Sequence, residues 1–238
     1  MDKQFVKDII RWDIENWSKC LHFWDSCVDL NNKNLKCLEL GARQGGPSLW
    51  LACKGNKVVC SDISYDTDID ELEKAKNLHK KYNCQDKITY QVIDALDIPY
   101  ENEFDIVIAK STLGGIAEFR QGNGDLEQRV VDQIYKCLKP NGKVLFVENG
   151  RGSFFHSYLR KKLNRNKGIW KYLVPKDYEQ LFLGFGFVKI KTVGFLACFG
   201  LNEKQRTILG KIDTVLDKAV PKSMRYVIMG YAEKKPKL

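Results

Sequence analysis

The feature that most constrains the fold is an alternation of short apolar segments with helical patterns over residues 35–150. Each apolar segment is nearly continuous, which is typical of strands that are buried on both faces of a parallel sheet. Segments with apolar residues at helical spacing separate them, as in a sheet covered by helices on both sides. The sequence predicts strands at residues 35–40, 57–61, 88–93, 104–110 and 143–148, with helices between them at 46–54, 69–82 and 125–138.

The two ends of the chain add further elements to this core. Apolar and aromatic residues recur at roughly helical spacing over residues 4–30, which predicts an N-terminal helix. Strands are predicted at 186–192 and 225–232, paired antiparallel, with a helix at about 203–218 between them. We therefore expect an α/β fold: a seven-stranded, mostly parallel, doubly wound sheet with N-terminal helices and a basic insertion after strand 5. It forms one domain, divided into an N-terminal cap (1–34), a core (35–150), a basic amphipathic lid (151–175) and C-terminal helices and strands (176–238).

Composition favours a cytoplasmic globular protein. The hydrophobic fraction of 44% is sufficient for a core. Neither a secretory leader nor a run of about 18 apolar residues is found, so no membrane span is expected. The eight cysteines form no C-x-x-C pair, and no cysteine or histidine cluster has the spacing of metal ligands. Reduced cysteines and no metal site are therefore expected.

A glycine-rich turn, ELGARQGGPS, joins the first core strand to the first core helix. Glycine permits positive φ and lets a ligand approach the main chain closely, and the start of the helix offers free N–H groups. Because ligands of such sheets bind at the carboxyl ends of the strands, the residues after the strands form the candidate site: Gly41, Asp62, Asp94, Lys110 and Glu148.

The acids at the strand ends indicate a nucleoside. Asp62 follows Gly41 by about 20 residues, where a carboxylate accepts hydrogen bonds from both ribose hydroxyls. Asp94 suits an adenine amino group, with Ala95 against the ring. Ile63 is expected either on the adenine ring or in the core. A nicotinamide dinucleotide and S-adenosylmethionine both match this pattern.

The glycine-rich turn favours S-adenosylmethionine. Residues 41–46, GARQGG, lack the middle glycine of the G-x-G-x-x-G motif, which admits a pyrophosphate. Glu39 would repel a pyrophosphate but suits a ligand with a positively charged amino group.

Together, these segments resemble the class I S-adenosylmethionine-dependent methyltransferases. The resemblance spans roughly residues 35–150 and is carried by ELGARQGG with SLWLA, then VVCSD, VIDALDIPY, FDIVIAKSTLGGI and LKPNGKVLFVENG. It implies that S-adenosylmethionine is the cofactor. It further implies that Glu39, Gly41, Ala42, Arg43 and Gly45 line the methionine side, Asp62 the ribose, Asp94 and Ala95 the adenine, and that Lys110 faces the methyl group and the acceptor.

One departure from the family pattern and one missing motif qualify this assignment. Arg43 stands where the family usually has glycine, and its side chain is expected to reach Glu39 or the cofactor carboxylate. The N/D-P-P-Y motif of amino-group nucleic-acid methyltransferases is missing after the fourth strand, where Lys110 and Ser111 stand instead. The acceptor is therefore expected to be a small molecule.

Three side chains are candidates for the catalytic group that an oxygen or nitrogen acceptor needs. Glu148 ends the fifth strand, Lys110 ends the fourth, and His156 lies in the segment that covers the acceptor site in this fold. His79, on a charged helix, is predicted to be solvated.

A basic segment follows the fifth strand, and it carries most of the net charge of +9. Residues 152–163 predict an amphipathic helix with Phe155, Tyr158 and Leu159 on one face and Arg160 on the other. Three interpretations remain open: a core helix with a solvated basic face, a lid that rests on a membrane through residues 151–171, or a nucleic-acid groove. Nucleic acid is the less favoured partner because no RNA-binding module is present.

The sequence thus predicts O-methylation of a small-molecule, lipid-linked or glycan acceptor by a cytoplasmic protein that associates with the inner face of a membrane. An RNA methyltransferase and a non-catalytic binding module of the same fold are the alternatives. The oligomeric state is left open.

Overall fold

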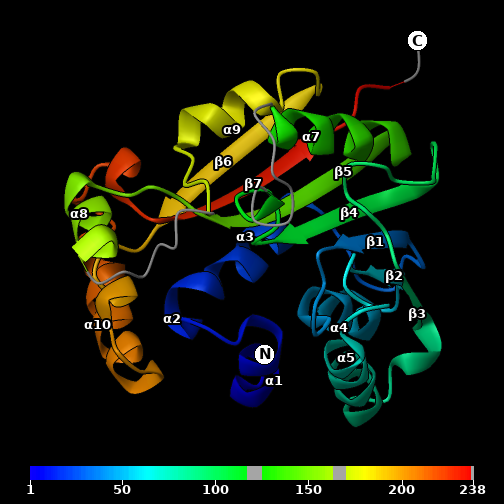
Figure 1. The fold of residues 1–238 in the computed structure, drawn as a ribbon, viewed down its shortest axis with the longest axis horizontal. Coiled ribbons are helices and arrows are strands. Elements are labelled where there is room, and N and C mark those ends of the chain that lie inside the picture. Colours follow the sequence, from blue (N-terminus) through cyan, green and yellow to red (C-terminus); the bar gives the residue numbers. More distant parts are fainter. Residues whose placement is uncertain (117–124, 163–169, 237–238) are drawn as a thin grey trace.

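The computed structural model describes residues 1–116, 125–162 and 170–236. Its central element is a seven-stranded sheet in the order β3-β2-β1-β4-β5-β7-β6 (Figure 1). Strands β1 to β5 run parallel, and β7 is antiparallel to both β5 and β6. The strands are β1 (Lys36–Leu40), β2 (Lys57–Ser61), β3 (Ile88–Gln91), β4 (Phe104–Lys110), β5 (Leu138–Asn149), β6 (Phe187–Val193) and β7 (Val227–Glu233). The prediction of a mostly parallel, doubly wound sheet with an antiparallel end is confirmed.

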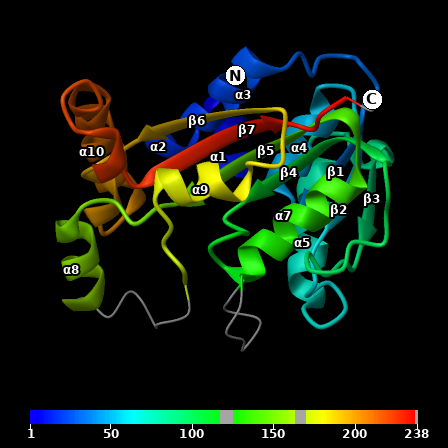
Figure 2. The same ribbon diagram turned by 90° about the horizontal axis from the view of Figure 1, so that it is seen from above.

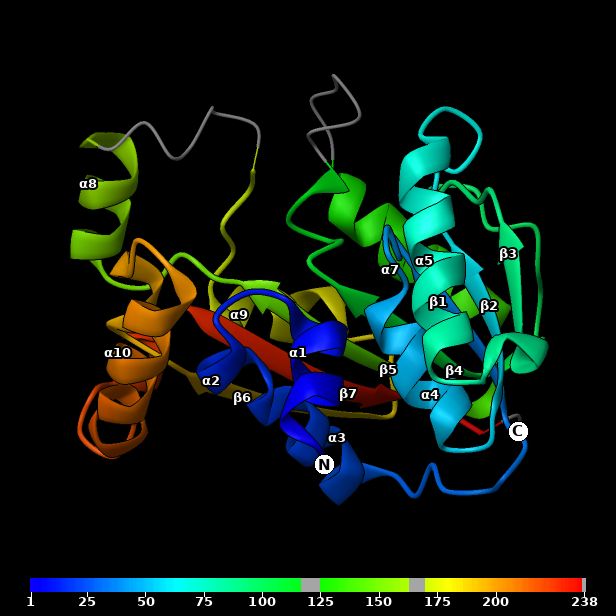
Figure 3. The same cartoon turned by 90° about the horizontal axis from the view of Figure 1, so that it is seen from below.

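Helices cover both faces of this sheet. One face carries α1 to α5 (Figure 3), and the other carries α7 and α9 (Figure 2). Helices α8 and α10 lie side by side at one end of the molecule in all three views. The helices are α1 (Lys3–Ile10), α2 (Ile14–Trp17), α3 (Lys19–Cys27), α4 (Gly46–Cys53), α5 (Ile69–Lys81), α7 (Leu126–Cys137), α8 (Phe154–Lys162), α9 (Pro175–Leu181) and α10 (Glu203–Leu216), with 3-10 turns at η1 (Gln85–Lys87), η2 (Ala197–Phe199) and η3 (Lys222–Met224).

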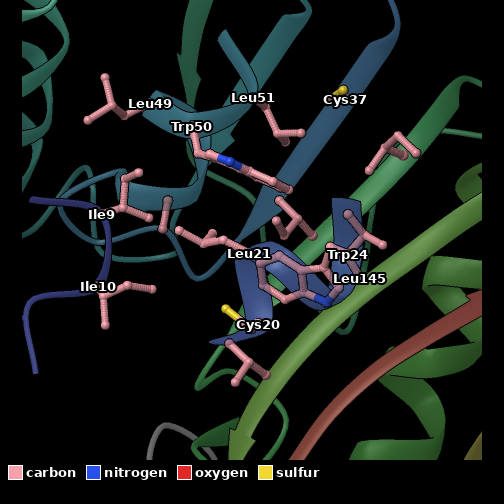
Figure 4. Close-up of a cluster of buried hydrophobic side chains, with 14 of the residues drawn as sticks. Ile9, Ile10, Cys20, Leu21, Trp24, Cys37, Leu49, Trp50, Leu51 and Leu145 are labelled. Carbon is pink, nitrogen blue, oxygen red and sulfur yellow. The ribbon is translucent and has the colours of Figure 1, made fainter. Parts of the chain in front are cut away.

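Two hydrophobic clusters fill the space on either side of the sheet. Successive strand residues point to opposite faces, so that Ile106 packs in the cluster under α1, α3 and α4, whereas Val107 packs in the cluster under α7 and α9. Trp24 and Trp50 are at the centre of the first cluster, with ring centroids 5.6 Å apart (Figure 4). This double burial explains why the strands are continuously apolar.

The N-terminal segment is three helices instead of the single helix predicted over residues 4–30. The first break spans Arg11 (φ 70°) to Asp13 (φ 46°), which both have left-handed backbone conformations, and the second falls at Ser18. The N–H groups of Asp13 and Ile14 donate to the Glu203 carboxylate of α10 over 3.1 and 2.8 Å. A contact across the fold, distant in sequence, therefore sets the first break, and helical spacing alone could not reveal it.

The basic segment also differs from its prediction. The predicted helix over residues 152–163 is present as α8, but the exposure of several of its side chains is opposite to the prediction. Phe155 and Tyr158 are exposed, whereas the Arg160 guanidinium turns inward and donates to the carbonyl oxygens of Gly150 and Arg151. In the described ranges, no helix combines the length and the apolar character that crossing a bilayer requires.

Candidate functional site

A cavity of about 410 Å³ opens at the carboxyl ends of β1 to β4. Four of the five predicted strand-end residues line it, and Glu148 does not. Because the strand order is β3-β2-β1-β4, these residues follow one another along the sheet edge. The lining residues are Gly41, Ala42, Arg43, Asp62, Ile63, Ile93, Asp94, Ala95, Lys110, Ser111, Thr112, Gly115, Ile116 and Trp170.

The turn after β1 needs glycine at two positions. Gly41 has φ +64°, and a Cβ atom there would lie 2.8 Å from Oγ1 of Thr112. Gly45 has φ +68°, and a Cβ atom there would lie 2.5 Å from the His79 ring. Gly41 thus lets the turns after β1 and β4 meet at the cavity. Gly45, which does not line the cavity, lets α5 pack against the start of α4.

Asp62 and Asp94 are both placed for polar contacts with a ligand. Oδ2 of Asp62 accepts the Arg43 N–H at 2.8 Å, and Oδ1 accepts from the N–H and hydroxyl of Ser64 at 2.9 and 2.7 Å. An ionised carboxylate has about four acceptor positions, so Asp62 keeps capacity for further donors. Oδ1 of Asp94 accepts the Leu96 N–H at 2.9 Å, and Asp94 lines the cavity beside Ala95.

Glu39 lies behind the turn and does not line the cavity. Its Oε2 accepts the N–H of Ser48 at 2.7 Å and the Ser48 hydroxyl at 2.5 Å. Within the described ranges, Oε1 makes no hydrogen bond. Burial raises the pKa of Glu39 to about 7, and the nearby Lys110 works against that rise.

Lys110 lies between the first cavity and a second one of about 440 Å³. The two cavities share Ala42, Arg43 and Lys110, and Arg11 lines the second. Burial lowers the pKa of Lys110, and the charge of Glu39 opposes that effect. The second cavity is therefore lined by side chains of both charges: Arg11, Arg43 and Lys110 are cationic, and Asp68 and Glu71 are acidic. Sequence reasoning missed Arg11, because nothing in its segment indicates that the chain turns toward the site there.

Glu148 holds the backbone that follows β4. Its buried carboxylate accepts the N–H groups of Thr112 (2.8 Å), Leu113 (2.9 Å) and Gly114 (3.2 Å). Burial raises the pKa of Glu148 to about 7, and these hydrogen bonds oppose the rise. The structure thus places Glu148 behind the cavity wall, where it positions the loop.

The structure does not bring His156 to the cavity either. Its buried ring accepts at Nδ1 from the N–H of Ser153 (3.1 Å), and Nε2 donates to the Phe195 carbonyl at 2.8 Å. His79 is also buried, bonded at Nε2 to the Gly45 carbonyl (2.8 Å) and at Nδ1 to the Tyr90 hydroxyl (2.7 Å). The prediction that His79 is solvated is wrong, because α5 turns this residue toward the glycine-rich turn.

Trp170 is a site residue that the sequence did not reveal. Its indole lies against Gly114 and Gly115, where added Cβ atoms would approach Nε1 to 2.7 Å and Cζ3 to 2.8 Å. It lines the cavity beside Gly115 and Ile116. An isolated tryptophan in a basic segment gives no signal of this position.

The chemistry of the cavity fits the cofactor that the sequence indicates. Carboxylates at the ends of β2 and β3 suit ribose hydroxyls and an adenine amino group, and Gly41 leaves the main chain accessible. Arg11 and Lys110 line the second cavity and provide positive charge for a carboxylate group, and the buried Glu39 lies near Lys110. No group of three or more His, Cys, Asp or Glu side chains that could hold a metal ion is found in the part of the chain that the structure describes.

The chain is similar to known methyltransferases. A family model described as "Methyltransferase domain" matches residues 38–146. Sterol 24-C-methyltransferase of Debaryomyces hansenii is 29% identical over 113 residues, which are 47% of this chain and 27% of that protein. Phosphoethanolamine N-methyltransferase 2 of Caenorhabditis elegans is 26% identical over 129 residues, 52% of this chain and 25% of that one. The chain thus spans only about a quarter of the length of these two relatives.

A solved structure shares the fold. Phosphoethanolamine N-methyltransferase 2 of Haemonchus contortus, in complex with S-adenosyl-L-methionine, superposes with a TM-score of 0.64 at 20% identity, covering 96% of this chain and 56% of that one. Three observations point to the same kind of domain: the sheet order, the glycine-rich turn at the centre of the sheet, and the match to a methyltransferase domain over residues 38–146. Residues 38–146 therefore match a methyltransferase domain, and the chain has the fold of S-adenosylmethionine-dependent methyltransferases.

Proposed function

We propose that the chain transfers the methyl group of S-adenosylmethionine to an oxygen atom of a small-molecule acceptor, and that this oxygen is already ionised when it binds. When bound, the cofactor supplies an electrophilic methyl group, so that the protein has to position the acceptor and exclude water. The observation that carries the proposal is the absence of a base on the acceptor side of the cavity, among the residues that the structure describes.

We assign the acceptor side to Ser111, Gly115, Ile116 and Trp170, which are among the residues that line the cavity. The lining carboxylates, Asp62 and Asp94, stand at the ends of β2 and β3, on the nucleoside side. Glu148 is engaged by three N–H groups, and both ring nitrogens of His156 have partners. An acceptor that has to be deprotonated on the enzyme finds no base here. An acidic phenol or a carboxylate needs none, because its oxygen is already ionised.

We assign Lys110 to the methionine part of the cofactor. Its side chain reaches the cavity shared with Arg11, and Glu39 lies on the same face of the sheet. The ammonium group of Lys110 pairs with the cofactor carboxylate there, and the carboxylate of Glu39 favours the cofactor amino group. Lys110 therefore acts as a binding residue.

The experiment is transfer of a labelled methyl group to a panel of small acids, phenols, amines and RNA, followed by mild base treatment of the product. Methyl esters release methanol under these conditions, whereas methyl ethers and methylamines retain the label. Release from acids, or label retained by phenols, supports the proposal. Label transferred only to amines or to RNA contradicts it. S-adenosylhomocysteine binding without transfer to any acceptor would favour the non-catalytic alternative.

Amine methylation is the second candidate. Two similar proteins are named phosphoethanolamine N-methyltransferases. An aliphatic amine is mostly protonated at neutral pH, so this acceptor has to lose its proton to solvent or to a side chain before the transfer. Retention of the label by an amine product after base treatment distinguishes this candidate from carboxylate methylation.

We further propose that α8 contacts an anionic lipid surface at the inner face of a membrane. Phe154 is 86% exposed, Phe155 53% and Tyr158 50%, and exposed Lys162 stands on the same helix. Aromatic side chains beside cations suit the boundary of an anionic bilayer. Sedimentation with phosphatidylserine vesicles should fall in Phe154→Ser, but not in the control Leu183→Ser, whose leucine is 75% exposed elsewhere. Equal sedimentation of the two variants would contradict the proposal.

A further inference from the structure

A third cavity lies at the carboxyl end of β5, and it shares no lining residue with the cofactor cavity. Its volume is about 310 Å³. It is lined by Trp12, Asn149, Leu159, Arg160, Tyr172, Cys198, Phe199 and Arg206. The cavity thus combines aromatic walls with two guanidinium groups, drawn from the N-terminal segment, β5, α8, η2 and α10.

The positive charge of this cavity is incompletely neutralised. The two terminal nitrogens of Arg160 donate to the carbonyl oxygens of Arg151 (2.9 Å) and Gly150 (3.1 Å), which carry no net charge. Within the described ranges, no carboxylate pairs with Arg160. Arg206 has one acidic partner, Glu203, at 3.4 Å. A half-buried guanidinium without a counterion is costly, and an oxyanion relieves that cost.

Aromatic rings hold both guanidinium groups at the cavity wall. Cζ of Arg160 lies 4.0 Å from the Tyr172 ring centroid, and Cζ of Arg206 lies 5.2 Å from that of Trp12. Such stacking fixes the plane of the guanidinium group and leaves its N–H edge available for an anion. One donor in the wall, Nε of Arg206, is buried without a hydrogen-bond partner, and an oxyanion can accept from it. Unpaired buried polar atoms are rare in folded proteins, and a missing polar ligand is one explanation for them.

A short segment connects this cavity to the cofactor cavity. Trp170 lines the cofactor cavity and Tyr172 lines the third one, with ring centroids 6.4 Å apart. The Lys171 N–H donates to the Gly114 carbonyl at 2.9 Å, and the Leu173 carbonyl accepts from the Arg151 N–H at 2.9 Å. Residues 170–173 therefore form a wall with one cavity on either side.

We propose that the cavity between Arg160 and Arg206 binds an oxyanion, a phosphate or a carboxylate, that belongs to the methyl acceptor. The claim that the anion is part of the acceptor rests on the proposed function. The claim that the cavity binds an anion does not. The acceptor's acidic group is held by the two arginines, and its reacting atom extends past the wall formed by residues 170–173.

The test is calorimetric titration with inorganic phosphate, and separately with acetate, at low ionic strength. Arg206→Gln and Arg160→Gln should each weaken binding of the preferred anion by about tenfold, because each removes one charge-assisted contact. Arg160→Lys keeps the charge and should retain part of the affinity. Lys204→Gln removes an exposed cation that lies two residues from Arg206 on α10, and it should leave the affinity unchanged.

A parallel titration with S-adenosylhomocysteine checks that each variant is folded and separates this proposal from the proposed function. Intact S-adenosylhomocysteine binding with no anion binding in the wild type would overturn the proposal, as would equal losses in Lys204→Gln and Arg206→Gln. The acceptor assignment is tested with any acidic acceptor found in the methyl-transfer panel. Arg206→Gln should raise its KM about tenfold with little change in kcat, and an unchanged KM would overturn that part.

Discussion

The main-chain N–H of Arg43 donates a 2.8 Å hydrogen bond to Oδ2 of Asp62. This bond connects the turn after β1 to the turn after β2 across neighbouring parallel strands. Arg43 has φ 44°, in the left-handed region that non-glycine residues rarely occupy. The backbone of Arg43 thus takes part in the site whatever its side chain contacts, and Asp62 both shapes the turn and faces the cavity.

Replacing Asp62 should weaken cofactor binding strongly. We expect Asp62→Ala to lower the affinity for S-adenosylhomocysteine at least about tenfold, because hydrogen bonds to a charged group contribute about 1.5–3 kcal/mol. Calorimetric titration measures the loss. Asp66→Ala, which removes a nearby exposed carboxylate, is the control. Equal affinities in the two variants would remove Asp62 from the site.

Gly41→Ala should damage both folding and binding. The substitution forces a side chain into φ +64° and places Cβ 2.8 Å from Oγ1 of Thr112. We expect a destabilisation of about 1 kcal/mol or more and weaker S-adenosylhomocysteine binding, measured by denaturant unfolding and calorimetry. Gly184→Ala, where an added Cβ meets no atom within 4 Å, should be nearly neutral. A stable Gly41→Ala protein with normal affinity would contradict this account of the turn.

Lys110→Met should distinguish the two ends of the cofactor. If Lys110 pairs with the methionine carboxylate, the variant loses about tenfold or more in affinity for S-adenosylhomocysteine. It keeps its affinity for 5′-methylthioadenosine, which lacks the amino-acid group. Competitive titration with both compounds measures the difference. A loss of equal size for both compounds would show that Lys110 acts on the nucleoside or on the fold.

The buried carboxyl group of Asp13 should make stability depend on pH. Burial raises its pKa to about 7, and the hydrogen bond from the Tyr226 hydroxyl opposes that rise. Between about pH 4 and 7 the native state then binds more protons than the unfolded state, so the free energy of unfolding falls as pH rises. Glu39 and Glu148, with pKa values also raised to about 7, act in the same direction.

Asp13→Asn should therefore reduce the loss of Tm between pH 5 and pH 8, by roughly 3 °C for each kcal/mol recovered in a chain of this size. Asparagine tolerates the left-handed backbone of residue 13 and can still accept from Tyr226. Thermal unfolding at several pH values measures the effect. Asp86→Asn, at an exposed position, should keep the wild-type profile, and identical profiles in both variants would count against Asp13.

The sheet and the nucleoside side of the cavity could be predicted because they depend on local patterns. Apolar runs indicate buried strands, and the residue after each run falls at the carboxyl edge of the sheet wherever the strand is parallel. Asp62 and Asp94 both follow this rule, and both line the cavity.

The remaining parts depend on contacts between distant segments. Arg160 lies on the half of α8 that periodicity assigns to solvent, but it turns inward because the ring of Tyr172 and two carbonyl oxygens receive it. His79 is in a charged helix and is nonetheless buried, since the missing Cβ of Gly45 leaves room for its ring. Trp170 reaches the cavity only because Gly114 and Gly115 accommodate an indole. None of these partners is adjacent in sequence.

The wall at residues 170–173 separates the molecule into two functional units. The nucleoside-facing residues come from turns that the sheet itself fixes. The arginine-lined cavity is assembled from α8, η2 and α10, which follow β5 in the chain, and from the N-terminal segment. On the proposed acceptor assignment, natural variation in these peripheral segments would exchange one acceptor for another while the cofactor turns stay the same. Chimeric proteins cut at Asn149 should inherit cofactor affinity from the segment that precedes the cut.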